Sequence, residues 1–312
     1  MKKFILLSVF GLIIFSAGIQ NSFAQKYTPN QINIDTLIRV LSSDSVEGRK
    51  PGTSGIEKAA RYIEQYFSAI GLHYFFPSSF RDTFRIGDVE TYNLVGLINA
   101  NTLNDEYIVI GAHLDHLGMK KNSNDDVFNG ANDNASGVAA VIKIASVLKE
   151  QTFNKKVIIA IFSGEEKGLL GAMHLATRLK DMQINLRYVI NFDMIGYPLT
   201  QAPGKVYLTG YNLSDFAIKA NEFIGESFIN QVSIDASNML FRAADNYPFY
   251  LKFGIPAHTV STFDFTNYPY YHRPDDEYKY IDISNTEKIV ERMTAVLTGL
   301  LEADTEINLI RE

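Results

Sequence analysis

The segment Lys156–Glu166, with the sequence KVIIAIFSGEE, decides the fold expected for this chain. Residues 157–162 are apolar without alternation, which is typical of a strand that helices cover on both faces of a parallel sheet. Glu165 and Glu166 follow almost at once, and burying such a pair costs free energy unless a cation or hydrogen bonds compensate the charge. The segment therefore predicts a central strand that leads into a charged site at its carboxyl end.

Two further apolar runs extend this pattern in both directions. YIVIGAHLD ends with His113 and Asp115, and RYVINFDMIG contains Asp193 near its end. Helical segments at 134–150 and 169–180 separate the three runs, and Asn134 or Ser136 can cap the first of these helices. Alternation of strands and helices in this way predicts a parallel sheet covered by helices.

The remaining segments complete an α/β fold. Residues 56–72 space their apolar side chains at three and four, which predicts an amphipathic helix. No internal repeat or Pro/Gly/Ser-rich linker divides the chain, so residues 25–312 are expected to form one catalytic domain. We expect a three-layer α/β/α sandwich with a mostly parallel, mixed central sheet, with further strands at 91–100, 205–211 and 257–263 and helices at 214–225 and 285–302.

The first 24 residues have the pattern of a signal peptide. A pair of lysines precedes the apolar run Phe4–Ile19, and Ser22 and Ala24 supply the small residues that signal peptidase accepts. The alternative is an N-terminal membrane anchor, although the run is short for a membrane span. We expect cleavage after Ala24 and a periplasmic or secreted protein without stable membrane association.

Composition excludes several classes of protein. The 312 residues include 29 basic and 35 acidic side chains, and their net charge of −6 becomes −8 when the two lysines of the signal peptide are removed. An acidic chain of this kind is not expected to bind nucleic acid. The chain contains no cysteine, which excludes disulfides and thiolate metal sites.

Acidic and imidazole side chains gather where the expected strands end. His113, Glu165, Glu166 and Asp193 follow three separate strands, and the carboxyl ends of such strands converge on one edge of an open sheet. Each residue alone has a simpler interpretation, such as a backbone-bound histidine, a solvated acidic turn or, for Asp133, a turn and helix cap. The presence of all these residues at one edge instead favours a site for a divalent metal. Histidine nitrogens and carboxylate oxygens are suitable ligands for Zn²⁺, Mn²⁺ or Co²⁺.

Five motifs in the chain resemble, in order, those of the co-catalytic dizinc aminopeptidase and glutamate carboxypeptidase family of clan MH metallopeptidases. That family includes secreted bacterial leucine aminopeptidases, glutamate carboxypeptidase II and the glutaminyl cyclases. Any one motif is a weak signal, whereas all five in order are specific. The motifs are GAHLDH (111–116), NGANDNASG (129–137), FSGEEKGLLGA (162–172), NFDMIG (191–196) and YHRPDDEYKYID (271–282).

The resemblance implies a role for each matching residue and two Zn²⁺ per chain. One zinc is bound by His113 and Asp193, the other by Glu166 and His272, and Asp133 bridges them. Three further residues act on the reaction: Glu165 is the general base, Asp115 orients His113, and Tyr271 helps to stabilise the oxyanion.

The resemblance also implies a set of functions. The expected function is an aminopeptidase that removes N-terminal residues from peptides. A glutaminyl cyclase-like zinc acyltransferase is an alternative, but those enzymes lack one or more of the ligands. A carboxypeptidase acting on acidic C-termini requires basic residues in the pocket, and only Arg242 and Arg273 lie near the later motifs. A receptor-like binding module would have lost ligands or the base. The oligomeric state stays open.

Some residues near these motifs depart from the family pattern or stand outside it. Asn246 occupies a position where the family often has histidine, in a segment that shapes the pocket. His116 is expected to contact solvent at the edge of the site, and His258 to pack within a strand. The aromatic segment Phe263–Tyr271, joined by Phe249 and Tyr250, is expected to line the approach to the metals and to favour large apolar side chains in the substrate.

Overall fold

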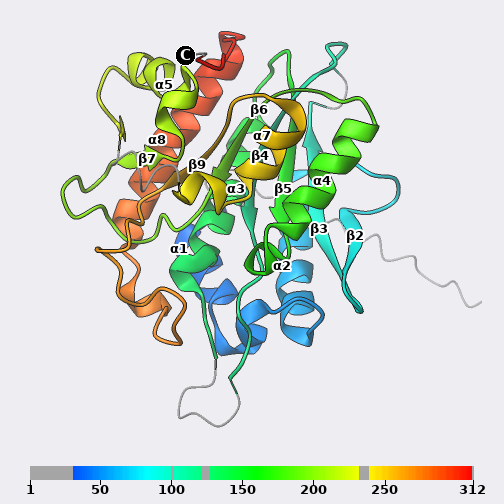
Figure 1. The fold of residues 1–312 in the computed structure, drawn as a ribbon, viewed down its shortest axis with the longest axis vertical. Helices are drawn as coiled ribbons and strands as arrows, with labels where there is room; N and C mark the ends of the chain where they lie inside the picture. The colour runs from blue at the N-terminus through cyan, green and yellow to red at the C-terminus, as the bar shows by residue number, and fades with distance from the viewer. Residues whose placement is uncertain (1–30, 100–101, 121–126, 232–238, 311–312) are drawn as a thin grey trace, which may run out of the picture.

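The structure is a computed structural model that describes residues 31–99, 102–120, 127–231 and 239–310 (Figure 1). The expected signal peptide and its cleavage after Ala24 lie outside the described residues. Among the residues that are described, no helix has both the length and the apolar character needed to cross a membrane.

Four parallel strands form the centre of a mixed sheet. Their spatial order is β5 (Lys156–Phe162), β4 (Glu106–His113), β6 (Asn185–Phe192) and β9 (Ala257–Ser261). Beside β5 lies the antiparallel β3, and beside β9 the antiparallel β7, so the sheet is parallel only in its centre. The remaining strands are β1 (His73–Tyr74), β2 (Arg81–Ile86), β3 (Val89–Ile98), β7 (Val206–Leu208) and β8 (Ile229–Asn230), of which β1, β2 and β8 lie at the edges.

Helices cover both faces of this sheet, which confirms the expected sandwich. One face carries α1 (Ile34–Leu41), α2 (Ser54–Ile70), α3 (Gly137–Leu148), α5 (Phe216–Ile224) and α8 (Ile283–Glu302). The other face carries α4 (Leu170–Asp181) and α7 (Asn246–Phe253), which lie in front of the sheet in Figure 1. Short helical turns complete the chain: η2 (Asp44–Arg49), η3 (Ala131–Ser136), η4 (Glu165–Lys167), η5 (Tyr211–Leu213) and η6 (Tyr278–Tyr280).

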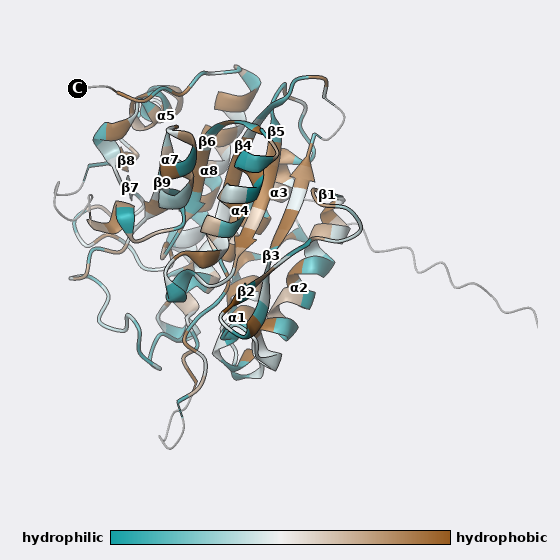
Figure 2. Cartoon of the chain, turned by 45° about the vertical axis from the view of Figure 1, so that its right-hand side comes forward, coloured by the Kyte–Doolittle hydropathy of each residue, from teal (hydrophilic) through white to brown (hydrophobic). Residues whose placement is uncertain are grey.

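The central strands are buried because helices pack on both of their faces. Every residue of β5 is buried, and the apolar strands form a continuous hydrophobic band through the molecule in Figure 2. Sequence analysis assigned no element to α1, β2 or α7. The edge strand β2 is half-polar and largely exposed, and α7 contains Pro248, which a helix tolerates within its first turn.

The order of the central strands creates a crevice at their carboxyl ends. Strand β4 lies between β5 and β6. The connection from β4 to β5 runs through α3 on one face, and the connection from β5 to β6 runs through α4 on the other. Open α/β sheets bind ligands where connections diverge in this way.

Candidate metal centre

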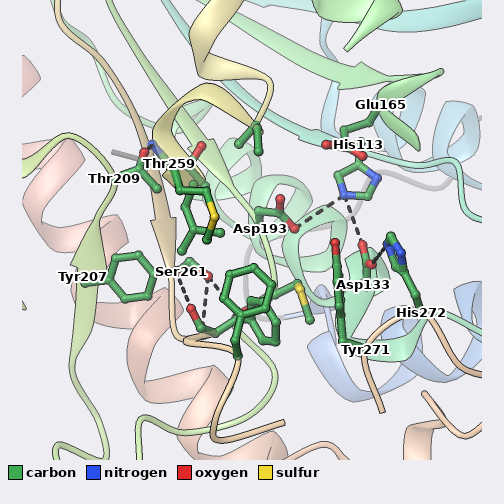
Figure 3. A pocket seen from close by; sticks show the side chains of 17 residues that line it. His113, Asp133, Glu165, Asp193, Tyr207, Thr209, Thr259, Ser261, Tyr271 and His272 are labelled. Atoms are coloured by element: carbon green, nitrogen blue, oxygen red, sulfur yellow. Dashed lines mark hydrogen bonds and ion pairs between the residues drawn. The ribbon is translucent and has the colours of Figure 1, made fainter. Parts of the chain in front are cut away.

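The structure brings the five expected metal ligands together at this crevice, and Figure 3 shows all of them except Glu166. Each comes from a segment at the carboxyl edge of the sheet. His113 is the last residue of β4, Asp193 follows β6, and Glu166 lies in the turn η4 after β5. Asp133 lies in η3, between β4 and α3, and His272 lies in the long loop after β9.

The distances between these side chains divide the site into two halves that share Asp133. In the first half-site, His113 Nε2 lies 3.3 Å from Asp133 Oδ1 and 3.4 Å from Asp193 Oδ1. In the second half-site, His272 Nε2 lies 3.2 Å from both Asp133 Oδ2 and Glu166 Oε2. Each carboxylate oxygen of Asp133 therefore faces a different histidine.

These separations fit divalent metal ions. Ligands that bind one tetrahedral zinc at about 2.0–2.1 Å lie about 3.3 Å from one another, and histidine nitrogen and carboxylate oxygen are zinc donors. Asp193 Oδ1 is buried and has no hydrogen-bond partner among the described residues. A buried carboxylate oxygen of this kind is costly unless a cation compensates it.

The pKa values of two buried carboxyl groups in the site shift in opposite directions. Burial, reinforced by Asp245 and Asp193, raises the pKa of Glu165 well above its ordinary value despite the nearby His113. Burial also disfavours the ionised form of Asp133, but three surrounding imidazoles hold its pKa well below the ordinary value. The shared ligand is therefore ionised, while Glu165 has a high affinity for a proton.

Glu165 and Glu166 face different surroundings although they are adjacent. Glu165 lines the pocket above His113 (Figure 3). Glu166 Oε2 instead lies 3.2 Å from His272 Nε2. The backbone N–H of Glu165 donates to Asp115 Oδ1 at 3.1 Å, which fixes the start of the turn. The pair therefore divides between the pocket and the candidate metal site.

The contact between Asp115 and His113 differs from the expected one. His113 Nδ1 lies 3.1 Å from the backbone carbonyl of Asp115, while the Asp115 carboxylate turns to η4. The strand ends at His113, so the alternation of side chains that placed both residues on one face no longer applies to Asp115. Donation from Nδ1 to the carbonyl leaves Nε2 of His113 as an acceptor for a metal.

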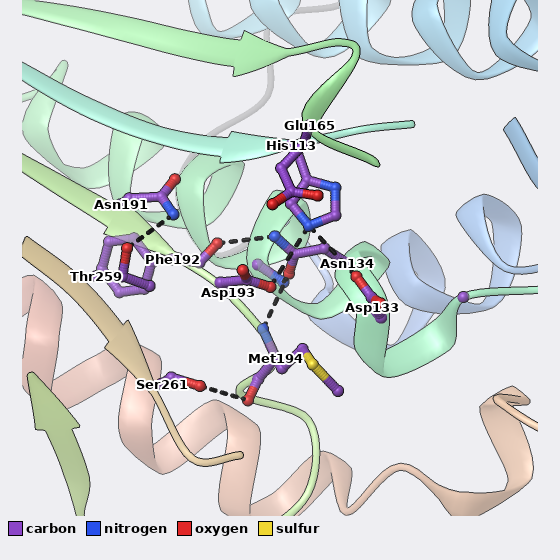
Figure 4. Close-up of polar contacts among 12 residues, drawn as sticks. His113, Asp133, Asn134, Glu165, Asn191, Phe192, Asp193, Met194, Thr259 and Ser261 are labelled. Atoms are coloured by element: carbon purple, nitrogen blue, oxygen red, sulfur yellow. Dashed lines mark hydrogen bonds and ion pairs between the residues drawn. The ribbon is translucent and has the colours of Figure 1, made fainter. Parts of the chain in front are cut away.

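The turn that carries Asp133 is braced by Asp276, to which sequence analysis gave no role, and by the expected cap residue Asn134. Asp276 accepts hydrogen bonds from the backbone N–H groups of Asn132 at 2.8 Å and Asp133 at 3.0 Å. Asn134 donates to the Phe192 carbonyl and accepts from Met194 N, which ties the turn to the end of β6 (Figure 4). It also accepts from Gly137 N, so Asn134 caps α3.

Arg49 is a further supporting residue, and it is completely buried. Its guanidinium donates to the carbonyls of Leu114 at 2.8 Å, Asn129 at 2.6 Å and Gly130 at 2.9 Å. Burial lowers the pKa of Arg49 to about 10, so the group stays charged at neutral pH beneath the acidic cluster. An isolated arginine far from the motifs gives no signal of this role in the sequence.

Two histidines outside the expected ligand set have different surroundings. His258 is buried in β9, where Nε2 lies 2.6 Å from Ser214 Oγ and Nδ1 lies 2.9 Å from the Thr209 carbonyl, which confirms the expected packing. The expectation for His116 is wrong, because its side chain is buried and Nδ1 lies 2.7 Å from Glu166 Oε1. With Asp133 and Glu166 it forms a second cluster of metal-binding residue types.

A pocket of about 190 Å³ opens beside the first half-site. The expected aromatic lining is confirmed for Phe263, Phe265 and Tyr271. The expectation for Phe249 and Tyr250 is wrong, because both pack in the core on the α4 face. The remaining walls are Met194, Tyr207, Thr209, Met239, Leu240, Ala243, Ala244, Thr259 and Ser261.

Two residues near the pocket clarify how its walls are held. Asn246 is buried and accepts a 2.7 Å hydrogen bond from Thr259, one of the lining residues. Tyr271 stacks on His272, with ring centroids 3.9 Å apart, and burial beside Asp133 raises its pKa. Tyr268 and Tyr270 belong to the same aromatic segment but contact Asp276 and Tyr280 instead.

Comparison with known proteins agrees with this site. The model of peptidase family M28 matches residues 93–297. A probable zinc metalloprotease of Pyrenophora tritici-repentis is 34% identical over 112 residues, covering 35% of this chain and 25% of that protein. Leucine aminopeptidase 2 of Trichophyton rubrum is 28% identical over 172 residues, covering 54% of this chain and 32% of that protein. The matched part of the chain thus spans a third or less of these curated relatives.

Solved structures share the fold at low sequence identity. The LapA aminopeptidase of Legionella pneumophila superposes with a TM-score of 0.70 at 21% identity, covering 88% of this chain and 73% of that one. The glutaminyl cyclase of Porphyromonas gingivalis superposes with a TM-score of 0.69 at 16% identity, covering 88% of this chain and 99% of that one. Because the family model spans more than half of the sequence, the chain belongs to peptidase family M28.

Proposed function

We propose that this protein is an exported, zinc-dependent aminopeptidase that hydrolyses the first peptide bond of peptide substrates. The observation that carries the proposal is the pair of half-sites joined through Asp133, with Glu165 beside them on the wall of a pocket. The named aminopeptidases among the relatives and the apolar run at the N-terminus support it.

In this proposal His113 and Asp193 hold one zinc, Glu166 and His272 hold the other, and Asp133 holds both. Bound zinc ions polarise a substrate carbonyl and lower the pKa of water to about 7. The protein supplies the donors already arranged at the required separations, so little ordering of side chains accompanies binding.

Glu165 moves the proton. Its carboxylate accepts a proton from the attacking water and then donates it to the nitrogen of the leaving amine. Its place on the wall of the pocket, next to His113 and Asp193, suits both transfers. Asp115 holds the backbone N–H of Glu165. Tyr271 lines the same pocket, and in this proposal its hydroxyl donates to the substrate oxygen as negative charge develops there.

The pocket favours an apolar N-terminal side chain. Phe263, Phe265 and Leu240 present apolar surface to it, and no lysine or arginine is among the described residues that line it. Arg242 and Arg273, the basic residues near the later motifs, are exposed and do not line it. This lining argues against a carboxypeptidase that binds acidic C-termini.

A glutaminyl cyclase is the alternative within this fold, since a cyclase structure superposes over 88% of this chain and 99% of its own. Against it, the structure holds all five ligands that the dizinc members are expected to use. A cyclase would convert N-terminal glutamine without releasing an amino acid, so the two activities are readily distinguished.

The test is a substrate panel on the purified mature chain. Leu-p-nitroanilide should be hydrolysed, N-acetyl-Leu-p-nitroanilide should not, and a peptide with N-terminal glutamine should lose the residue without cyclising. Elemental analysis should give two zinc ions per chain. Cyclisation without hydrolysis, or hydrolysis of the blocked substrate alone, would overturn the proposal.

A further inference from the structure

His116 is the one imidazole beside the candidate metal centre to which sequence analysis gave no role in the site. Its side chain is fully buried, although it follows the HLD motif on a segment that leaves the sheet. Nδ1 lies 2.7 Å from Glu166 Oε1 and 3.8 Å from Asp133 Oδ2. Such a histidine can either bind metal directly or hold a residue that does.

The distances separate these two possibilities. Every contact between proposed ligands in the two half-sites measures 3.2–3.4 Å, close to the edge of a tetrahedron around zinc. The contact from His116 to Glu166 is 2.7 Å, which is the length of a hydrogen bond from nitrogen to a carboxylate. His116 therefore contacts Glu166 as a donor, through its Nδ1–H.

The surroundings of His116 hold its ring with Nδ1 facing Glu166 Oε1. The backbone N–H of His116 donates to the Arg49 carbonyl, and the ring packs edge-on to Phe128. A Cβ atom on Gly130 would lie 2.7 Å from His116 Cδ2, so the ring is seated against a glycine. His116 Nε2 is buried and has no partner among the described residues.

We propose that His116 is a positioning residue that fixes the Glu166 carboxylate by hydrogen bonding to Oε1, so that Oε2 stays directed at the second metal. The inference deepens the proposed function and rests on its dizinc site. Glu166 lies on the short turn η4 and His272 on a loop, so neither residue of the second half-site is held by a strand. A fixed carboxylate compensates for this, because residues that orient ligands strengthen metal binding about 10–100-fold.

The test uses two substitutions of the same shape at one position. His116→Asn keeps a side-chain N–H near the Nδ1 position, whereas His116→Leu has the same branched shape without a donor. Zinc affinity of each half-site is measured by competition with a chromophoric chelator. The second half-site should bind zinc about 10–100-fold more weakly in the Leu variant. The Asn variant should stay within about threefold of wild type, and the first half-site should be unchanged in both.

The same pair of substitutions at His258 provides the control. This histidine is equally buried but hydrogen-bonds to Ser214 and Thr209, away from the metals. His258→Asn and His258→Leu should lower the melting temperature. Neither should weaken zinc binding at the second half-site relative to the first. A purely structural role for His116 would give the same result at both positions and would overturn the proposal.

A measurement on the wild-type chain keeps the inference testable if the Leu variant does not fold. Loaded with ¹¹³Cd²⁺, the protein should show cadmium–nitrogen coupling at two imidazoles, those of His113 and His272, and none at His116. Coupling at a third imidazole would show that His116 binds metal directly and would overturn the proposal. A wild-type chain that binds no zinc would instead refute the proposed function itself.

Discussion

The two half-sites are chemically alike but are built from different parts of the fold. In the first, His113 ends β4 and Asp193 follows β6, and these neighbouring strands are joined by ladder hydrogen bonds. In the second, Glu166 lies on η4 and His272 on a loop, with a left-handed backbone at φ 55°. The side chain of His113 is 1% exposed and that of His272 is 37% exposed.

The two halves of the proposed centre are therefore held in different ways: paired strands position the first, and a turn and a loop carry the second. Strand pairing sets the spacing of the first half-site, so few side-chain contacts are needed there. The second half-site depends on hydrogen bonds and ring stacking around Glu166 and His272. His272 also lines the pocket, so the second half-site adjoins the space proposed for the substrate.

Metal removal should produce the largest loss of activity and should show that the two half-sites release their metals at different rates. Because His272 is partly exposed and lies on a loop, we expect a chelator to remove the second metal before the first. Metal content by mass spectrometry and Leu-p-nitroanilide hydrolysis, followed together, should show two phases of metal loss and end without activity. Zn²⁺ or Co²⁺ should restore it. Simultaneous loss of both metals would contradict the comparison, and activity in metal-free protein would contradict the mechanism.

Substitution of Glu165 should lower turnover without disturbing either half. Glu165→Gln keeps the size of the side chain but cannot accept a proton, so kcat should fall by about 10²–10⁴-fold. Two zinc ions should remain bound, because Glu165 is not one of the proposed ligands. Glu166→Gln is the matched comparison and should weaken only the second metal. If Glu165→Gln lost a metal instead, the roles of the two glutamates would have to be exchanged.

Substrate preference should reveal which half-site shapes the pocket. Burying a leucine side chain contributes about 1.5–3 kcal/mol, so kcat/KM for Leu-p-nitroanilide should exceed that for the Glu substrate by about 10–100-fold. Phe265 lies on the same loop as His272 and lines the pocket, so Phe265→Ala should reduce this preference. Phe223→Ala is the control, since Phe223 is equally exposed, at 50%, but lies on α5 outside this pocket. A preference for Glu would refute the apolar pocket.

The acid stability of the metal-free chain should report on the sheet rather than on the metals. Burial lowers the pKa of His258 from 6.5 to about 4, so the unfolded chain binds more protons between these values. The stability of the metal-free chain should therefore fall as pH decreases from about 6.5 to 4, by about 3 kcal/mol in total from this residue. Urea unfolding at pH 7 and pH 4.5 measures the difference. His258→Gln should flatten this dependence, and an unchanged slope would show that other groups cause it.

The sequence by itself determined the central architecture and the residues that gather at its edge. Residues 157–162 are apolar throughout, which is only favourable in a strand covered on both faces, and β5 is buried along its whole length. Once such strands are parallel, their carboxyl ends must meet, so His113, Glu166 and Asp193 had to lie close together. The roles of individual residues came from the resemblance of the motifs and stay proposals.

Only the tertiary structure decided how the residues beyond the strand ends are used. After His113 the chain leaves the extended conformation, so the carboxylate of Asp115 turns to η4 and His116 turns inward to Glu166. Arg49 and Asp276 brace the same site from distant parts of the chain. Periodicity predicts which side of a regular strand a residue faces. It carries no information about turns and loops, where long-range hydrogen bonds fix each side chain.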